Sequence, residues 1–215
     1  SLLPTEKEPV VLLDVGATVD CKPYNIFQFG LMGDAFARDI LNKESPRVGL
    51  LSIGEEEGKG NSQVKEAYEL FKMAQNLNFS GNIEGRDLFT GEMDVAVCDG
   101  FVGNVALKLS EGLGLSLSRV LKRELLNSGF LPKLGSLLAK SAFRRFAKVV
   151  DYAEYGGAPL LGLQNISIVC HGRSSARAMQ NAIKMAGTFV RKGTNDRLAE
   201  TILANEELTR FSRAI

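Results

Sequence analysis

Two patterns of hydrophobic and polar positions alternate along the chain: short continuous apolar runs, and longer segments with apolar residues at helical spacing. Continuous runs rich in β-branched residues are typical of strands that are covered on both faces. They predict strands at 10–15, 47–53, 93–98 and 166–170, and the less apolar segment 79–84 is a further strand candidate. The helical periodicity predicts helices at 25–42, 62–77, 102–127, 174–192 and 195–213. Asn61 stands where the N-cap of the second helix is expected.

This order of elements predicts an α/β fold. Strands that alternate with helices imply crossover connections and a mostly parallel sheet with helices on both faces. A length of 215 residues fits one domain, so we take residues 1–215 as one α/β unit. In such sheets ligands bind beyond the carboxyl ends of the strands, and the residues that follow each apolar run are therefore the most informative.

Composition narrows the class of protein. The sequence has 45% apolar and 24% charged residues, which is ordinary for a globular protein. Because the net charge is only +1, the overall charge gives no reason to expect nucleic-acid binding. The three cysteines are widely spaced and fit neither a disulfide framework nor a metal site, so we expect reduced thiols in a cytoplasmic protein. No apolar run is long enough to span a bilayer. The opening SLLPT lacks an initiator Met, and we expect a longer native polypeptide that begins upstream.

Polar, glycine-bearing segments follow each of the five predicted strands. Together they suggest a backbone that approaches a ligand at one end of the sheet. The segments are DVGATVD at 14–20, GEEEGKGN at 54–61, EGRD at 84–87, DGFVGN at 99–104 and HGRSS at 171–175.

The segment 54–61 imitates nucleotide-binding motifs without matching them. A phosphate-binding Walker loop needs one more residue before its Gly-Lys pair and a hydroxyl residue after it, whereas Gly60 follows Lys59. No G-x-G-x-x-G follows a strand, and we expect no nucleotide or other cofactor. Gly58, Lys59, Gly60 and Asn61 open a helix, whose free N–H groups and dipole favour an anion. The alternative is a flexible turn with a solvated Lys59.

The segments 99–104 and 171–175 offer a second group of candidate site residues. Gly103 has no side chain and therefore lets the backbone approach a neighbouring group closely, and Asn104 supplies a side-chain amide at the start of a long helix. Asp99 either orients a substrate or another side chain, or caps that helix. His171, the only histidine, is either structural or catalytic. Gly172, Arg173, Ser174 and Ser175 begin a helix beside His171, and the guanidinium and hydroxyl groups suit phosphate or carboxylate.

The segment 119–150 is strongly basic and amphipathic. Its one acid is Glu124, and a break at Ser128–Gly129 predicts two helices that form a protruding hairpin. Such a pair suits an anionic membrane surface, an acidic protein partner, or packing in a dimer. For a membrane, the expected contacts are Phe130, Leu131, Lys133, Leu134, Lys140, Arg144 and Arg145.

These segments, in this order, resemble the bacterial phosphate acyltransferases of phospholipid synthesis. The resemblance is carried by LLDVGATVDCKP at 12–23, GLLSIGEEEGKGN at 49–61, NIEGRDLFTGEMDVAVCDGFVGNVALK at 82–108, and EYGGAPLLG through HGRSSA at 154–176. It extends from Val10 to Ile202. Members of that family are longer and begin with a further glycine-rich segment, which this sequence lacks.

The resemblance implies a reaction: acyl-[acyl carrier protein] and inorganic phosphate give acyl phosphate and the free carrier. It also implies a homodimer, peripheral membrane association, and a fold like those of phosphate acetyltransferases and isocitrate/isopropylmalate dehydrogenases. Under this hypothesis Lys59, Arg173 and the amides of 58–61 and 172–175 bind phosphate. Asn104 or His171 donates to the oxyanion, while Asp99 orients Lys59 or His171. The alternatives are an acyl-coenzyme A enzyme of the same fold and a non-catalytic, membrane-tethered module that binds the carrier.

Overall fold

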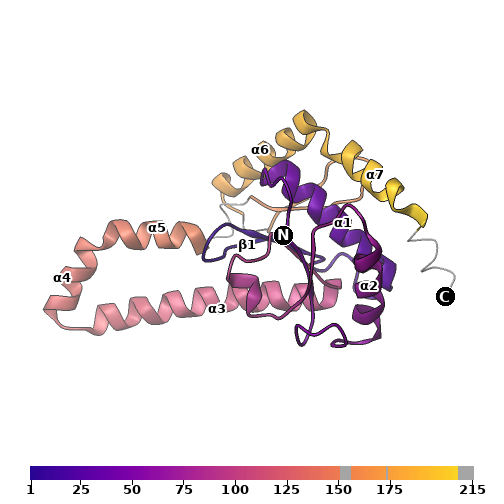
Figure 1. Cartoon of the computed structure of the whole chain (residues 1–215). Coiled ribbons are helices and arrows are strands. Elements are labelled where there is room, and N and C mark those ends of the chain that lie inside the picture. Colours follow the sequence, from indigo (N-terminus) through magenta and orange to yellow (C-terminus); the bar gives the residue numbers. More distant parts are fainter. Residues whose placement is uncertain (151–155, 173, 208–215) are drawn as a thin grey trace.

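The structure of the chain is a computed structural model that describes residues 1–150, 156–172 and 174–207 (Figure 1). The strands are β1 (Leu2–Leu3), β2 (Val10–Leu13), β3 (Val48–Leu51), β4 (Phe79–Ile83), β5 (Val95–Val97), β6 (Ala158–Pro159) and β7 (Ile168–Val169). The helices are α1 (Pro23–Ile40), α2 (Ser62–Met73), the 3-10 helix η1 (Asp87–Phe89), α3 (Gly100–Asn127), α4 (Phe130–Leu138), α5 (Lys140–Val150), α6 (Ala176–Lys192) and α7 (Thr194–Ala204).

The central sheet has five strands in the order β1-β2-β5-β3-β4. Strands β2, β5, β3 and β4 are parallel, and β1 joins the edge antiparallel to β2. The carboxyl ends of the four parallel strands therefore meet at one edge, as the alternation of strands and helices predicts.

Both faces of this sheet are covered. Successive residues of a strand point to opposite faces, so neighbouring residues pack into different core clusters. Val11 joins a core cluster with residues of α1 and α2, including Phe27 and Phe71. Its neighbour Leu12 joins a second cluster that includes Leu88 of η1, with Leu107 of α3 packed against it. The continuous apolar runs thus encode a sheet that is buried on both faces.

The fifth predicted strand, at 166–170, does not join the central sheet, so the prediction of one sheet for all five strands was wrong. β7 lies outside the central sheet and pairs antiparallel with β6 in a separate two-stranded sheet. Val169 is 53% exposed, so the apolar run at 166–170 does not mark a strand covered on both faces. Hence four of the five glycine-bearing segments, and not all five, follow strands of one sheet. Helix α7 is described to Ala204, and residues 208–213 of the predicted helix lie outside the described residues.

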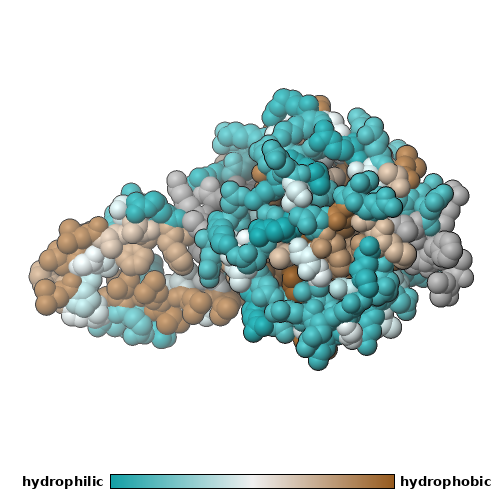
Figure 2. All heavy atoms as spheres, viewed as in Figure 1, coloured by the Kyte–Doolittle hydropathy of each residue, from teal (hydrophilic) through white to brown (hydrophobic). Residues whose placement is uncertain are grey.

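Helices α3, α4 and α5 form an arm that projects from the body (Figure 1). The predicted break at Ser128–Gly129 is present, but the returning limb consists of two helices, α4 and α5. Hydrophobic side chains gather along the arm and at its tip (Figure 2). Phe130 and Leu131 are each 78% exposed. Among the described residues, no helix is both long enough and apolar enough to cross a membrane.

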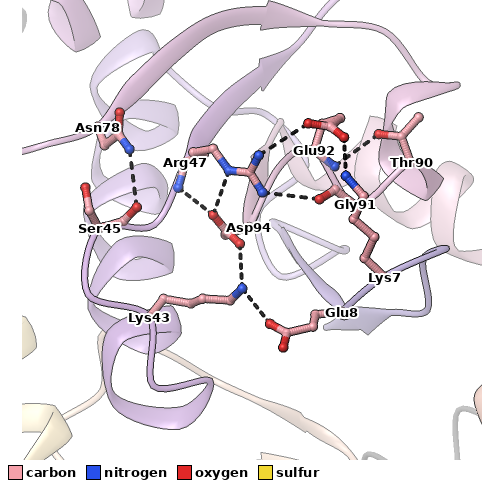
Figure 3. Close-up of polar contacts among 10 residues, drawn as sticks. All are labelled: Lys7, Glu8, Lys43, Ser45, Arg47, Asn78, Thr90, Gly91, Glu92 and Asp94. Atoms are coloured by element: carbon pink, nitrogen blue, oxygen red, sulfur yellow. Dashed lines mark hydrogen bonds and ion pairs between the residues drawn. The ribbon is translucent and has the colours of Figure 1, made fainter.

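A polar cluster ties together the opposite, amino-terminal edge of the sheet (Figure 3). The buried carboxylate of Asp94 accepts hydrogen bonds from the backbone N–H of Arg47 at 2.8 Å and from its Nε at 3.2 Å. Lys43 Nζ lies 3.0 Å from the other oxygen. Burial alone would raise the pKa of Asp94, but the Arg47 and Lys43 groups outweigh it and hold that pKa below its usual range.

Candidate active site

A cavity of about 590 Å³ opens beside the carboxyl end of β2. The loop after β2, the first turns of α3 and the segment from Gly156 to Ala178 contribute to its lining. Most of the wall is apolar and a smaller part is polar, which is typical of a small-molecule site. The main apolar lining residues are Leu13, Val15, Phe29, Met32, Leu107, Leu160, Leu161 and Val169. The main polar lining residues are Asp14, Thr18, Asn104, Lys108, Glu111, His171 and Ser174.

The buried carboxylate of Asp14 folds the loop after β2. Its Oδ1 accepts hydrogen bonds from the N–H groups of Gly16 and Ala17 at 3.0 Å each, and its Oδ2 accepts one from Thr18 at 2.7 Å. Gly16 has a φ of +121°, a region that favours glycine. A Cβ atom at Gly16 would lie 3.4 Å from Cγ of Asn104, so this loop lies directly against the Asn104 side chain.

Helix α3 brings Asn104 to the cavity. Asp99 caps the helix, because its Oδ1 accepts the N–H of Val102 at 2.9 Å. The N–H of Gly100 donates to the carbonyl of Thr18 at 2.9 Å and joins the start of α3 to the loop after β2. Asn104, Lys108 and Glu111 follow one another at i, i+4 and i+7 on one helix face, and all three line the cavity.

The segment that begins at Gly156 brings His171 and Ser174 to the same cavity. The N–H of Ser174 donates to the carbonyl of His171 at 2.8 Å, which closes a turn before α6. Ser175 caps α6 by accepting the N–H of Ala178 at 3.2 Å. Arg173 lies outside the described residues.

The segment 54–61 crosses the carboxyl end of β3 and presents Lys59 to solvent. The N–H of Lys59 donates to the carbonyl of Glu56 at 2.9 Å, and Asn61 caps α2 as predicted, with its Oδ1 2.9 Å from the N–H of Val64. Two of the neighbouring glutamates have cationic partners: Glu57 pairs with Lys72 on α2, and Glu55 lies 3.4 Å from Arg86. Their repulsion of an anion near Lys59 is therefore reduced.

The structure thus brings together part of the predicted set. Asn104, His171 and Ser174 share one cavity. Lys59 and Asp99 belong to the same edge of the sheet, but neither is among the described residues that line the cavity. The same holds for Gly58, Gly60, Asn61, Gly103, Gly172 and Ser175.

The sequence analysis did not assign a role to Lys108 or Glu111, which the cavity includes. The signal was available, because both lie at helical spacing from Asn104. Phe29 and Met32 of α1 also line the cavity, and their helical periodicity indicated only a core face.

The buried thiols are poorly suited to act as nucleophiles. Burial, with the negative charges of Asp99 and Asp14 nearby, raises the pKa of Cys98 far above its usual value. Burial also raises the pKa of Cys21. Within the described part of the chain, no three His, Cys, Asp or Glu side chains are grouped closely enough to hold a metal ion.

Comparison with known proteins finds a matching protein family and relatives that share one name, phosphate acyltransferase. Residues 1–197 match the family model described as fatty acid synthesis protein. A phosphate acyltransferase of Nitratidesulfovibrio vulgaris is 75% identical over 215 residues, which are 100% of this chain and 62% of that protein. The phosphate acyltransferase of Lawsonia intracellularis is 69% identical over 214 residues, covering 100% of this chain and 62% of that protein. That of Syntrophotalea carbinolica is 55% identical over 210 residues, covering 97% and 60%.

Proposed function

Because the chain belongs to the family of fatty acid synthesis proteins, we propose that it transfers a fatty acyl group from acyl-[acyl carrier protein] to inorganic phosphate. The product is acyl phosphate for phospholipid synthesis. The chain spans about 62% of the length of the first two relatives described above, which are named phosphate acyltransferases. The observation that carries the proposal is that Asn104, His171 and Ser174 line one cavity whose wall is mainly apolar.

Attack of phosphate on a thioester makes three demands on the protein. It must hold the anion close to the carbonyl carbon, stabilise the tetrahedral oxyanion, and let the thiolate leave. Asn104 and His171 are the donors to the oxyanion in this proposal. The hydroxyl of Ser174 holds phosphate, and Lys59 adds positive charge from the neighbouring loop.

The carbonyl carbon gains a bond to a phosphate oxygen and loses its bond to sulfur, and the thiolate takes up a proton from solvent. A thiol with a pKa near ~8.5 leaves without a strong acid. An acyl-enzyme intermediate is not needed, which agrees with the burial of Cys21 and Cys98. Asp99 acts indirectly in this scheme, because its cap fixes the start of the helix that carries Asn104.

Incubation of the chain with phosphate and either palmitoyl-[acyl carrier protein] or palmitoyl-coenzyme A tests this proposal. We expect acyl phosphate, trapped with hydroxylamine, from the carrier thioester. His171→Ala and Asn104→Ala should each lower kcat by about a hundredfold or more, as for removal of an oxyanion donor. Val190→Ala is the control, because Val190 is 70% exposed on α6 and does not line the cavity.

The alternatives appear as distinct outcomes of this assay. Faster turnover of the coenzyme A thioester would identify an acyl-coenzyme A enzyme. Carrier binding without product from either thioester would favour a non-catalytic module.

The arm formed by α3, α4 and α5 supports a second part of the proposal: reversible attachment of a cytoplasmic homodimer to an anionic membrane. Phe130, Leu131 and Leu134 are exposed on α4. The exposed basic residues are Lys133 on α4 and Lys140, Arg144 and Arg145 on α5. Buried apolar area and attraction to anionic lipid act together in such binding.

Vesicle sedimentation with and without anionic lipid tests the membrane contact. Phe130→Glu combined with Leu131→Glu should abolish sedimentation with anionic vesicles, whereas Val190→Glu on the body should not. Sedimentation that depends on neither the arm substitutions nor the lipid charge would contradict the attachment. The elution volume in size-exclusion chromatography with light scattering tests the dimer.

A further inference from the structure

Lys108 is a positively charged residue that lines the cavity. It is the only lysine or arginine side chain among the described lining residues. It follows Asn104 by one helical turn, so the Cβ atoms of the two residues are about 5–6 Å apart. Lys59, the cation that the sequence analysis selected, is not in the lining.

The negative groups around the cavity leave Lys108 available for a ligand. The Asp14 carboxylate accepts hydrogen bonds from the backbone N–H groups of Gly16, Ala17 and Thr18 in its own loop, and they hold it in that turn. Glu111 lies 2.9 Å from Lys108 Nζ, as an i, i+3 pair on the face of α3 that lines the cavity. An ammonium group has three donors, and the pair with Glu111 occupies one of them.

We propose that Lys108 binds a phosphate group in this cavity, beside Asn104 and His171. The assignment of the phosphate to a substrate rests on the proposed function. Glu111 holds the ammonium group over the cavity in the free protein, and the ligand then shares it with Glu111. Two sources have the same chemistry: inorganic phosphate, and the phosphodiester that links a carrier protein to its thioester arm.

This assignment also explains how the site combines its apolar and charged parts. A phosphate group carries its charge into a cavity whose remaining wall is mainly apolar, and such a charge needs a cation and hydrogen-bond donors. Lys108 and Asn104 supply both from one rigid helix. Lys59 then acts from outside the cavity, on a separate loop.

Two matched variants and a control test the role of Lys108. The side chain is 57% exposed, so Lys108→Met and Lys108→Arg should both fold, which circular dichroism checks. Lys184→Met is the control, because Lys184 is exposed on α6 and does not line the cavity. Phosphorus-31 NMR titration with inorganic phosphate measures binding. The rate of acyl phosphate formation gives KM and kcat for each substrate.

We expect Lys108→Met to weaken binding of a phosphate group by roughly tenfold or more, because a hydrogen bond to a charged group is lost. Lys108→Arg should restore part of the affinity, and Lys184→Met should change nothing. A rise in the KM for inorganic phosphate, larger than the fall in kcat, would assign the free anion to Lys108. A rise confined to the KM for the carrier thioester would assign the phosphodiester.

Glu111→Gln provides a second, independent test, in which the affinity for a phosphate group should change in the opposite direction. Removal of its carboxylate should tighten binding of the phosphate group, since it removes a competitor for Lys108. The proposal is overturned if Lys108→Met leaves phosphate binding and both KM values unchanged. Weakened phosphate binding by Lys108→Met in a chain that forms no acyl phosphate would keep the anion site and reject the proposed function.

Discussion

Gly103 packs against Asp14 so closely that a Cβ atom at Gly103 would lie 1.8 Å from the Asp14 carbonyl oxygen. This contact holds the first turn of α3 against the loop after β2, where both contribute to the cavity. A glycine at 103 is therefore required by packing, whether or not its N–H also contacts phosphate.

Gly103→Ala should disrupt the site and lower stability. The backbone oxygen cannot move aside as a flexible side chain would, so α3 and the loop must separate, at a cost of about 1–3 kcal/mol. Urea unfolding gives the change in stability, and the hydroxylamine assay gives the loss of activity.

Gly112→Ala is the matched control on the same helix. A Cβ atom there would meet nothing within 4 Å. The alanine should stabilise α3 by about 0.5–1 kcal/mol, because glycine is a poor helix former. Equal effects from the two alanines would contradict the packing argument.

The layers of the fold could be predicted from the sequence because β2, β3 and β5 are continuous apolar runs, whereas β4 contains the polar residues Ser80 and Asn82. Val11 and Leu12 are both buried, and they belong to the two core clusters on opposite faces of the sheet. The pairing of β7 could not be predicted in this way. A short apolar run such as ISIVC does not specify which strand it joins, and the partner β6 contains Pro159, which cannot donate in a ladder.

The candidate site could be predicted only in part, for a physical reason. The position of Asn104 follows from the topology, because the carboxyl ends of parallel strands meet at one edge. Whether Lys59 enters the cavity depends on the path of the loop 54–61, and local residue types do not fix that path. Lys108 was not predicted because it lies one helical turn beyond the segment 99–104 that follows the strand.

Asp94 should make stability depend on pH. Its pKa is lowered in the folded state, so its stabilising contribution is present above about pH 4, the ordinary value of the carboxyl, and is lost as the pH falls through the folded value. Asp94→Asn should therefore lower the free energy of unfolding at pH 7 by about 1–2 kcal/mol, a charge-assisted hydrogen-bond contribution reduced by the partial exposure of its partners.

The difference between Asp94→Asn and the unsubstituted protein should become smaller at pH 3. Urea midpoints at both pH values measure it. Glu92→Gln is the control, because Glu92 is 56% exposed and also pairs with Arg47. A difference that stays constant from pH 7 to pH 3 would show that Asp94 acts by packing alone.

The three cysteines should react with N-ethylmaleimide at different rates. Cys21 and Cys98 are buried with raised pKa values, whereas Cys170 is half-buried and lines the cavity. We expect Cys170 to be modified first at pH 7.5, and an acyl thioester to protect it. All three should react in 6 M urea, which controls for reagent quality. Modification of Cys98 as fast as Cys170 in the folded protein would contradict the burial of Cys98.

Asn82 should control the loop that carries Lys59. Its buried Nδ2 donates to the carbonyl of Glu56 at 2.9 Å, and the same carbonyl accepts the N–H of Lys59. Asn82→Asp replaces this donor with a carboxylate that repels the carbonyl, so amides 56–60 should exchange with deuterium at least tenfold faster. If Lys59 contributes to the reaction, kcat should fall as well. Asn78→Asp is the control, because Asn78 donates to Ser45 at 3.2 Å at the amino-terminal edge of β4. Unchanged exchange at 56–60 in Asn82→Asp would show that the loop keeps its shape without Asn82, and would leave Lys59 without a link to the sheet through this residue.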